Sequence, residues 1–295
     1  MSATASVTAT AGSAADQQAG GGLVVALLLP IALVNLVGFL LPVFNLALIS
    51  LQEVQASGAM TGGWSTAKWV SVVTDDFYWE LLWNTIRTSL GITLATLLVS
   101  YPIALYLHRS SGLWRSVLLV MVISPLLLSA VVRTYGWIAI LSDQGVVNSV
   151  LKAFGAAEPW RLMFNLTGVT IGLTEILMPY MILALVAGFG RLDPRAEEAA
   201  ATLGASPFRV FRRIVLPLSV PGIALGSLLT FVLAVSSFIT PKLLGGGRVF
   251  LLATEVYDQA IVTLDWPLAA TLSMIVLVVF GIAIAVYGRL VRSIG

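Results

Sequence analysis

The sequence contains no cysteine and a single histidine, His108. Disulfide and thiolate chemistry are therefore absent, and a metal site built from several histidines is excluded. Charged residues make up only 10% of the 295 residues, whereas an ordinary soluble domain has about 25%. The net charge of +2 is too small to indicate a nucleic-acid-binding surface. No G-x-x-x-x-G-K-[ST] segment occurs, so the chain has no phosphate-binding loop of that kind.

Apolar residues dominate instead, at 58% of the chain, with a mean hydropathy of +0.98. A helix needs about 20 apolar residues to cross the hydrocarbon core of a bilayer. Six runs reach that length, and together they predict an all-α polytopic membrane protein with six transmembrane helices. The runs are 23–51, 82–107, 116–141, 167–190, 218–240 and 267–288.

The first 22 residues differ from the rest of the chain. They are mainly Ala, Ser, Thr, Gly and Gln, with Asp16 as the only charge, which predicts a disordered cytoplasmic tail over 1–22. The run 23–51 lacks the basic start of a signal peptide and is too long for a signal core. We therefore expect a retained first helix, with the membrane domain covering 23–295.

The distribution of Lys and Arg predicts the orientation, because cytoplasmic connections are enriched in these residues. Odd-numbered connections contain five basic and nine acidic residues. Both termini and the segment 191–217 are therefore predicted to be cytoplasmic. Nine basic residues lie in even-numbered connections or after the last run, namely Arg109, Arg115, Arg191, Arg195, Arg209, Arg212, Arg213, Arg289 and Arg292.

The segment 191–217 has the pattern of a helix, a forced turn and a second helix. Asp193-Pro194 is an N-cap followed by proline at the first helical position. Gly204 can adopt the left-handed conformation that ends a helix. Ser206-Pro207 repeats the N-cap device, and Pro217 is predicted to stop the second helix.

The predicted second helix of this segment has an apolar side and a basic rim. Phe208, Phe211 and Val215 recur at helical spacing, with Arg209, Arg212 and Arg213 on the other faces. An amphipathic segment lying on anionic lipid is one interpretation. It explains neither the central glycine nor the paired helix starts, so it is disfavoured.

The spacing of this segment carries a resemblance. Glu198-Ala199-Ala200, Gly204 after three residues and Ile214-Val215-Leu216-Pro217 after nine more match, without departure, the cytoplasmic EAA loop of ABC importer permeases. The resemblance extends over about 80–295 and is nearest to the spermidine/putrescine-type subfamily. The segments that carry it are Asn84-Thr85, Tyr101-Pro102-Ile103-Ala104, Val132-Arg133-Thr134-Tyr135-Gly136-Trp137 and Leu243-Leu244-Gly245-Gly246-Gly247.

The resemblance implies a multi-pass protein of the bacterial inner membrane that performs no chemistry and binds no cofactor. It implies two separate ATPase subunits that hold ATP and Mg, a second similar permease, and a periplasmic or lipid-anchored solute-binding protein, with lipid around the complex. Polyamine is the leading solute, and amino-acid-like solutes, phosphonate or iron are alternatives. The residues expected to couple to the ATPase are Glu197, Glu198, Ala199, Ala200, Gly204, Ala205, Phe208, Phe211, Arg212, Ile214, Leu216 and Pro217.

Two charged residues lie well inside apolar runs. Arg133 and Glu175 are each 8 residues from the expected outer ends of their helices, at 141 and 167. This places both about 12 Å below the surface. A charge near the bilayer centre costs about 2.5–3.5 kcal/mol, so each needs a partner. We expect the two to pair with each other, either as a structural contact or as part of a solute site.

The predicted solute path combines these charges with aromatic and acidic residues. Tyr135 and Trp137 also suit an aromatic belt at the membrane interface. Pro179 and other prolines in the runs suit tolerated kinks whose freed carbonyls neighbouring helices satisfy. The path candidates are Arg133, Tyr135, Trp137, Glu175, Tyr257 and Asp258.

Two other classes of membrane protein are disfavoured. A secondary transporter would show internal repeats, and the two halves of this chain show none. An intramembrane enzyme would need a nucleophile beside a base. His108 lies next to Arg109, with no serine motif around it.

Overall fold

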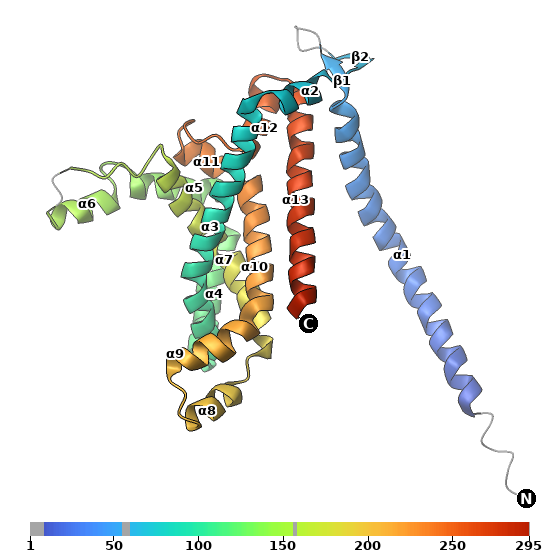
Figure 1. Cartoon of the computed structure of the whole chain (residues 1–295), viewed down its shortest axis with the longest axis vertical. Coiled ribbons are helices and arrows are strands. Elements are labelled where there is room, and N and C mark those ends of the chain that lie inside the picture. Colours follow the sequence, from blue (N-terminus) through green and yellow to red (C-terminus); the bar gives the residue numbers. More distant parts are fainter. Residues whose placement is uncertain (1–8, 55–59, 156–157, 295) are drawn as a thin grey trace, which may run out of the picture.

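A computed structural model describes residues 9–54, 60–155 and 158–294, and Figure 1 shows their arrangement. The regular structure of these residues is helical apart from one small antiparallel hairpin. The elements are α1 (Ala9–Ile49), β1 (Gln52–Val54), β2 (Met60–Trp64), α2 (Ala67–Thr74), α3 (Asp76–Arg109), α4 (Gly112–Ile123), η1 (Ser124–Leu127), α5 (Ala130–Leu141), α6 (Val146–Ala153), α7 (Leu166–Gly188), η2 (Phe189–Arg191), α8 (Pro194–Thr202), α9 (Pro207–Val210), η3 (Phe211–Val215), α10 (Leu216–Ser236), α11 (Ile239–Leu244), α12 (Leu252–Tyr257), η4 (Asp258–Val262) and α13 (Trp266–Ile294).

The predicted all-α membrane fold is confirmed. Among the described residues, 5 helices are long and apolar enough to cross a membrane, and one bent pair can supply a sixth crossing. The 5 spans are Leu28–Ile49, Asp76–Arg109, Leu166–Gly188, Pro207–Ser236 and Trp266–Arg292.

The third predicted span, 116–141, is not the continuous helix that the sequence suggested. Its two parts, Gly112–Leu127 and Ala130–Ala153, are bent by 101°. Pro125 opens a short 3-10 turn, and Leu128 has extended backbone, φ −97° and ψ 140°. The Ser129 side chain then accepts the Val131 N–H and starts α5 as a new helix. The depth estimated along a straight helix therefore does not apply to Arg133.

Helix α1 extends further toward the N-terminus than expected. It begins at Ala9, so the backbone over 9–22 is helical where the sequence predicted disorder, and residues 1–8 lie outside the described residues. Alanine, the strongest helix former, is frequent in this stretch. In Figure 1 α1 leans away from the other helices, and no side chain of the window within Leu28–Ile49 is buried.

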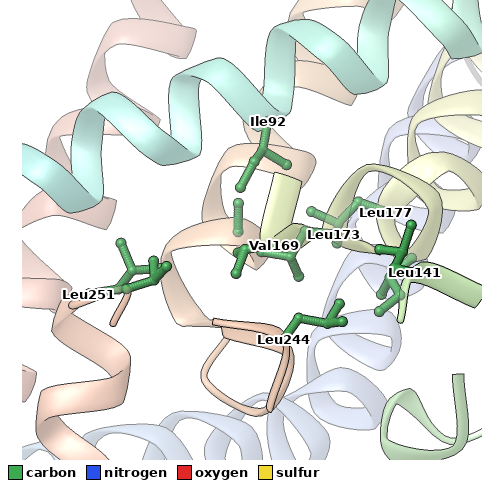
Figure 2. Close-up of a cluster of buried hydrophobic side chains, with 10 residues drawn as sticks. Ile92, Leu141, Val169, Leu173, Leu177, Leu244 and Leu251 are labelled. Atoms are coloured by element: carbon green, nitrogen blue, oxygen red, sulfur yellow. The ribbon is translucent and has the colours of Figure 1, made fainter. Parts of the chain in front are cut away.

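Helix α7 forms the centre of the bundle and packs between α3 and α10. Figure 2 shows the apolar cluster on it, where Val169, Leu173 and Leu177 meet Ile92 from α3 and Leu244 from α11. At the other end, α7 and α10 approach so closely that a Cβ on Gly188 would lie 2.2 Å from the Gly222 Cα. Small residues at such crossings are typical of membrane helices.

The two ends of the bundle have different connections. In Figure 1 α8 and α9 lie at one end, and α1 and α13 both point their terminal ends in that direction. The β1–β2 hairpin, α2, α11 and α12 lie toward the opposite end. The described ends of α1 and α13, Ala9 and Ile294, therefore lie toward the same end of the bundle as the 191–217 segment.

Candidate functional sites

The turn between α8 and α9 depends on Gly204, as the sequence predicted. Gly204 has φ +81°, the left-handed region. Its N–H donates to the Ala201 carbonyl at 2.9 Å, and the Ala205 N–H donates to the Ala200 carbonyl at 3.1 Å. This pair of hydrogen bonds is a Schellman motif, in which glycine avoids the strain that a Cβ would add. The motif fixes the angle between α8 and α9.

The start of α8 is capped and tied to α3. The Asp193 carboxylate accepts the Arg195 N–H at 2.9 Å, which confirms the predicted N-cap. Glu197 Oε2 accepts from Arg109 Nη2 at 2.6 Å, joining α8 to the last residue of α3. Ser206 has the extended backbone of an N-cap, but its side chain makes no capping hydrogen bond.

The prediction that Pro217 stops the second helix is wrong. The backbone stays helical from Pro207 to Ser236, through the π-helical turn η3 and into α10. The Leu216 N–H donates to the Phe211 carbonyl, five residues back. Pro217 follows directly, at the first turn of α10, where a missing N–H is tolerated. The wide turn therefore absorbs the proline, and π-turns of this kind are frequent at functional sites.

The exposed apolar side chains of this segment match the predicted apolar side only in part. Val215 is fully buried, and Phe211 packs its ring edge-on against Tyr101 at 5.9 Å. Phe208 is 72% exposed and Leu203 is 89% exposed. Leu203 is the C-cap residue, belongs to no helical repeat and was not among the predicted coupling residues. Of the other predicted residues, Glu198, Ala199, Arg212, Leu216 and Pro217 are exposed, and Ala200, Ala205 and Ile214 are partly buried.

An aromatic cluster connects this segment to the membrane helices. The Tyr101 ring of α3 meets the Phe189 ring at 5.7 Å and the Phe211 ring at 5.9 Å. Its hydroxyl lies 3.0 Å from the Ser219 hydroxyl of α10. The segment is thus held by packed side chains of both α3 and α10.

Arg133 and Glu175 form the predicted pair. Arg133 Nη2 donates to Glu175 Oε1 at 2.7 Å and to the Glu175 carbonyl oxygen at 3.0 Å, and Nη1 lies 3.4 Å from the Ile176 carbonyl oxygen. The Arg133 side chain is only 8% exposed, against 35% for Glu175. The pair fastens α5, the second part of the broken span, onto α7.

The backbone contacts of Arg133 have a specific cause. In an α-helix the carbonyl of residue 175 would accept the N–H of residue 179, but residue 179 is Pro179, which has none. The guanidinium of Arg133 satisfies this freed carbonyl from the neighbouring helix. The arginine therefore serves two acceptors of one residue, its carboxylate and its carbonyl.

Trp137 completes this site. Its Nε1 donates to Glu175 Oε2 at 3.0 Å, so both carboxylate oxygens of Glu175 have a donor from α5. Tyr135 lies two residues after Arg133 and is exposed, on a different face of α5. The structure therefore joins three of the predicted path residues in one junction and leaves Tyr135 outside it.

Tyr257 and Asp258 belong to a second cluster. Asp258 forms an ion pair with Lys242 of α11. The Lys242 ammonium lies 4.5 Å from the centre of the Tyr257 ring, which stacks on Phe238 at 5.1 Å. Lys242 and Phe238 were missed, since the sequence gives no signal that pairs them with residues 15 or more positions away.

A hydrogen bond of 2.9 Å between the hydroxyls of Thr134 and Thr240 links α5 to α11.

The fold and these sites define a polytopic membrane permease with a helix–turn–helix loop at one end of its bundle. The family described as "Binding-protein-dependent transport system inner membrane component" matches residues 97–295. The chain belongs to this family.

Curated relatives agree with this assignment. The spermidine/putrescine transport system permease PotB of Escherichia coli is 36% identical over 219 residues, which is 74% of this chain and 80% of that protein. PotB of Haemophilus influenzae is 34% identical over 213 residues, covering 72% and 74%. The molybdenum transport system permease ModB of Mycobacterium bovis is 29% identical over 220 residues, covering 72% and 81%.

Solved structures share the fold. A bacterial alginate ABC transporter, crystallised with its pentasaccharide-bound periplasmic protein, matches with a TM-score of 0.69 at 19% identity, over 95% of this chain and 97% of that one. The MetNI methionine ABC transporter matches with a TM-score of 0.56 at 14% identity, over 75% and 99%. The chain is a multi-pass inner-membrane permease subunit of an ABC importer.

Proposed function

We propose that this chain forms the membrane path of an importer for polyamines, moving spermidine or putrescine delivered by an external binding protein. The observation that carries the proposal is the 36% identity to the spermidine/putrescine permease of Escherichia coli over 219 residues. The molybdenum permease matches over a similar length at 29%.

Energy comes from partner subunits, with ATP and Mg bound there. Exposed Leu203 and Phe208 flank the Gly204 turn at the tip of the loop and supply apolar anchors for a groove on an ATPase. Closure of the ATPase pair moves α8 and α9, and the Tyr101 contacts pass this movement to α3 and α10. The loop and both termini are cytoplasmic in this proposal.

The uncovered apolar surfaces call for neighbours in the membrane. Helix α1 exposes many apolar side chains over residues 28–44 and packs against α13. Lipid or a second, similar permease covers these faces. The complete importer in this proposal contains two permeases, two ATPase subunits and a periplasmic or lipid-anchored binding protein.

The predicted path residues divide into two roles. Arg133, Trp137 and Glu175 form a structural junction, because every oxygen of the Glu175 carboxylate has a donor. Tyr257 and Asp258 remain path residues, with Tyr135 exposed on α5 as a further wall.

The test is uptake by the complete importer in proteoliposomes, with ATP inside and the binding protein outside. We expect uptake of labelled putrescine or spermidine that requires both. Uptake of an amino acid, a phosphonate, iron or molybdate, with none of either polyamine, would refute the substrate. Uptake that persists without ATP and the binding protein would refute the importer mechanism and favour a secondary transporter.

A further inference from the structure

In the cluster around Lys242, the lysine's own ammonium is bound by a carboxylate and an aromatic ring. The ammonium pairs with the Asp258 carboxylate and lies over the Tyr257 ring, 4.5 Å from the ring centre. Phe238 stacks on that ring at 5.1 Å, with the two planes 17° apart. A carboxylate combined with an aromatic face is a general recognition site for alkylammonium groups. In the described part of the chain, the Lys242 ammonium is the cation that lies over an aromatic ring.

The side chain of lysine has the same chemistry as one end of a polyamine. Four methylene groups carry a primary ammonium, and putrescine is a four-carbon chain with such an ammonium at each end. A site that accommodates the Lys242 ammonium therefore has the carboxylate and the aromatic face that one end of a polyamine needs.

The ion pair between Lys242 and Asp258 is accessible to a competing ammonium group. The side chains of Lys242 and Asp258 are 37% and 40% exposed, so solvent and solute reach both. Exposed lysine–carboxylate pairs are weak, because water competes for both charges. The Arg133 guanidinium, by contrast, is held by a carboxylate and two carbonyl groups. Of these two pairs, the Lys242 pair is the one that a solute ammonium can replace.

The backbone at this cluster is irregular on both sides. Phe238 lies at the break between α10 and α11, and Asp258 is the first residue of the π-helix η4. Broken helices and π-turns in membrane proteins are tolerated where they line cavities or functional sites. Figure 1 places α11 and α12 toward the end opposite α8 and α9, where an external binding protein would deliver its solute.

We propose that Asp258 and Tyr257 form a transit site for a primary ammonium group, and that Lys242 occupies this site as a tethered surrogate until a solute replaces it. The resident ammonium neutralises the carboxylate between transport events, so inorganic cations are not bound there. The identity of the transported solute rests on the proposed function, but the ammonium site itself is tested separately.

The experiment uses the absence of cysteine from this chain. In the complete importer, Lys242→Cys vacates the site and leaves a thiol beside it. The rate at which 2-aminoethyl methanethiosulfonate modifies this thiol is then measured by mass spectrometry of this chain alone. We expect saturating putrescine or butylammonium to slow the reaction on the order of tenfold, and butane-1,4-diol to leave it unchanged.

Two controls isolate the site. Asp258→Asn in the Lys242→Cys background should abolish the protection by butylammonium. Lys68→Cys is the matched control, since Lys68 forms an ion pair with Asp265 and is not stacked on a ring in the described contacts. Its thiol should show little protection. Equal protection of the two thiols would mean general charge screening and would overturn the proposal, as would no protection of the thiol in Lys242→Cys.

Uptake supplies a second readout that does not depend on a cysteine variant. Lys242→Met removes the surrogate, so the KM for putrescine uptake should fall several-fold, whereas Asp258→Asn should raise it. An unchanged KM in Lys242→Met would refute the surrogate role. If butylammonium protects the thiol of Lys242→Cys while the importer transports no polyamine, the proposed substrate fails and the ammonium site stands.

Discussion

The junction between Arg133, Glu175 and Pro179 gives the sharpest prediction about stability. Arg133→Met removes the donor to Glu175 Oε1 at 2.7 Å and the donor to the Glu175 carbonyl at 3.0 Å. The carboxylate then loses its countercharge. The carbonyl also loses its partner, because Pro179 offers no N–H within the helix.

The magnitudes follow from burial. Breaking one side of a buried ion pair costs about 3–5 kcal/mol. Glu175 is 35% exposed, so water compensates in part, and we expect about 3 kcal/mol for Arg133→Met. Glu175→Gln should also lower stability, because the buried Arg133 guanidinium loses its countercharge and the single amide oxygen cannot accept from both Arg133 and Trp137. The double variant Arg133→Met/Glu175→Gln removes both charges but leaves the carbonyl unsatisfied, at about 1–3 kcal/mol.

Adding Pro179→Ala to the double variant separates the carbonyl from the charges. The alanine N–H can close the missing intrahelical bond to the Glu175 carbonyl. The triple variant should therefore be more stable than the double variant. The gain in stability is reduced by the packing contacts that the buried proline ring contributed. The assay is the temperature at which half of the detergent-solubilised importer is lost from its monodisperse peak in size-exclusion chromatography.

Two results would refute this reasoning. If the single substitutions are additive in the double variant, the two side chains are not energetically coupled. If Pro179→Ala gives the wild-type and the double variant the same change in stability, Arg133 does not replace the missing N–H. Uptake assigns the role: a stable double variant that transports identifies a structural junction, and a stable one that does not transport places these charges on the solute path.

Three further predictions concern the loop and the orientation. Gly204→Val should cost about 1–2 kcal/mol from backbone strain alone, because φ is +81° and the space around the added Cβ is open. The substitution should abolish the ATPase activity that the binding protein stimulates. If this stimulation is intact, the docking role is excluded. Leu203→Asp and Phe208→Asp should release the ATPase during co-purification, and retention of the ATPase would mean that the exposed tip is not the anchor. Single cysteines test the orientation, which a reversed pattern would overturn: we expect impermeant reagents outside the cell to label positions Ser71 and Thr263 but not Ser110 and Ser206.

Local rules made much of the 191–217 segment predictable from sequence. The N-cap at Asp193 and the left-handed Gly204 depend on few neighbouring residues, and both are present as expected. The pairing of Arg133 with Glu175 was also predictable, because opposite charges in apolar runs have few alternative partners. None of these inferences required knowledge of how distant helices pack.

Other features depend on tertiary contacts that the sequence does not encode locally. The neighbours of Lys242 come from α12 and η4, so its site forms only when these segments fold against α11. Leu203 is exposed because of its position at the turn, and no periodicity in the sequence marks it. The bent third span was missed because a proline in an apolar run is compatible with both a kinked and a broken helix.

Three prolines show why the sequence locates such problems but not their solutions. Each removes a backbone donor, and each is accommodated differently. At Pro125 the helix breaks and restarts at Ser129, at Pro179 an arginine from another helix satisfies the freed carbonyl, and at Pro217 a π-turn precedes a continuing helix. The choice depends on which donors the surrounding fold brings within reach. Two of the three solutions involve α5 or α7, so the broken span and its arginine are one device: the bend brings Arg133 onto the carbonyl that Pro179 leaves free.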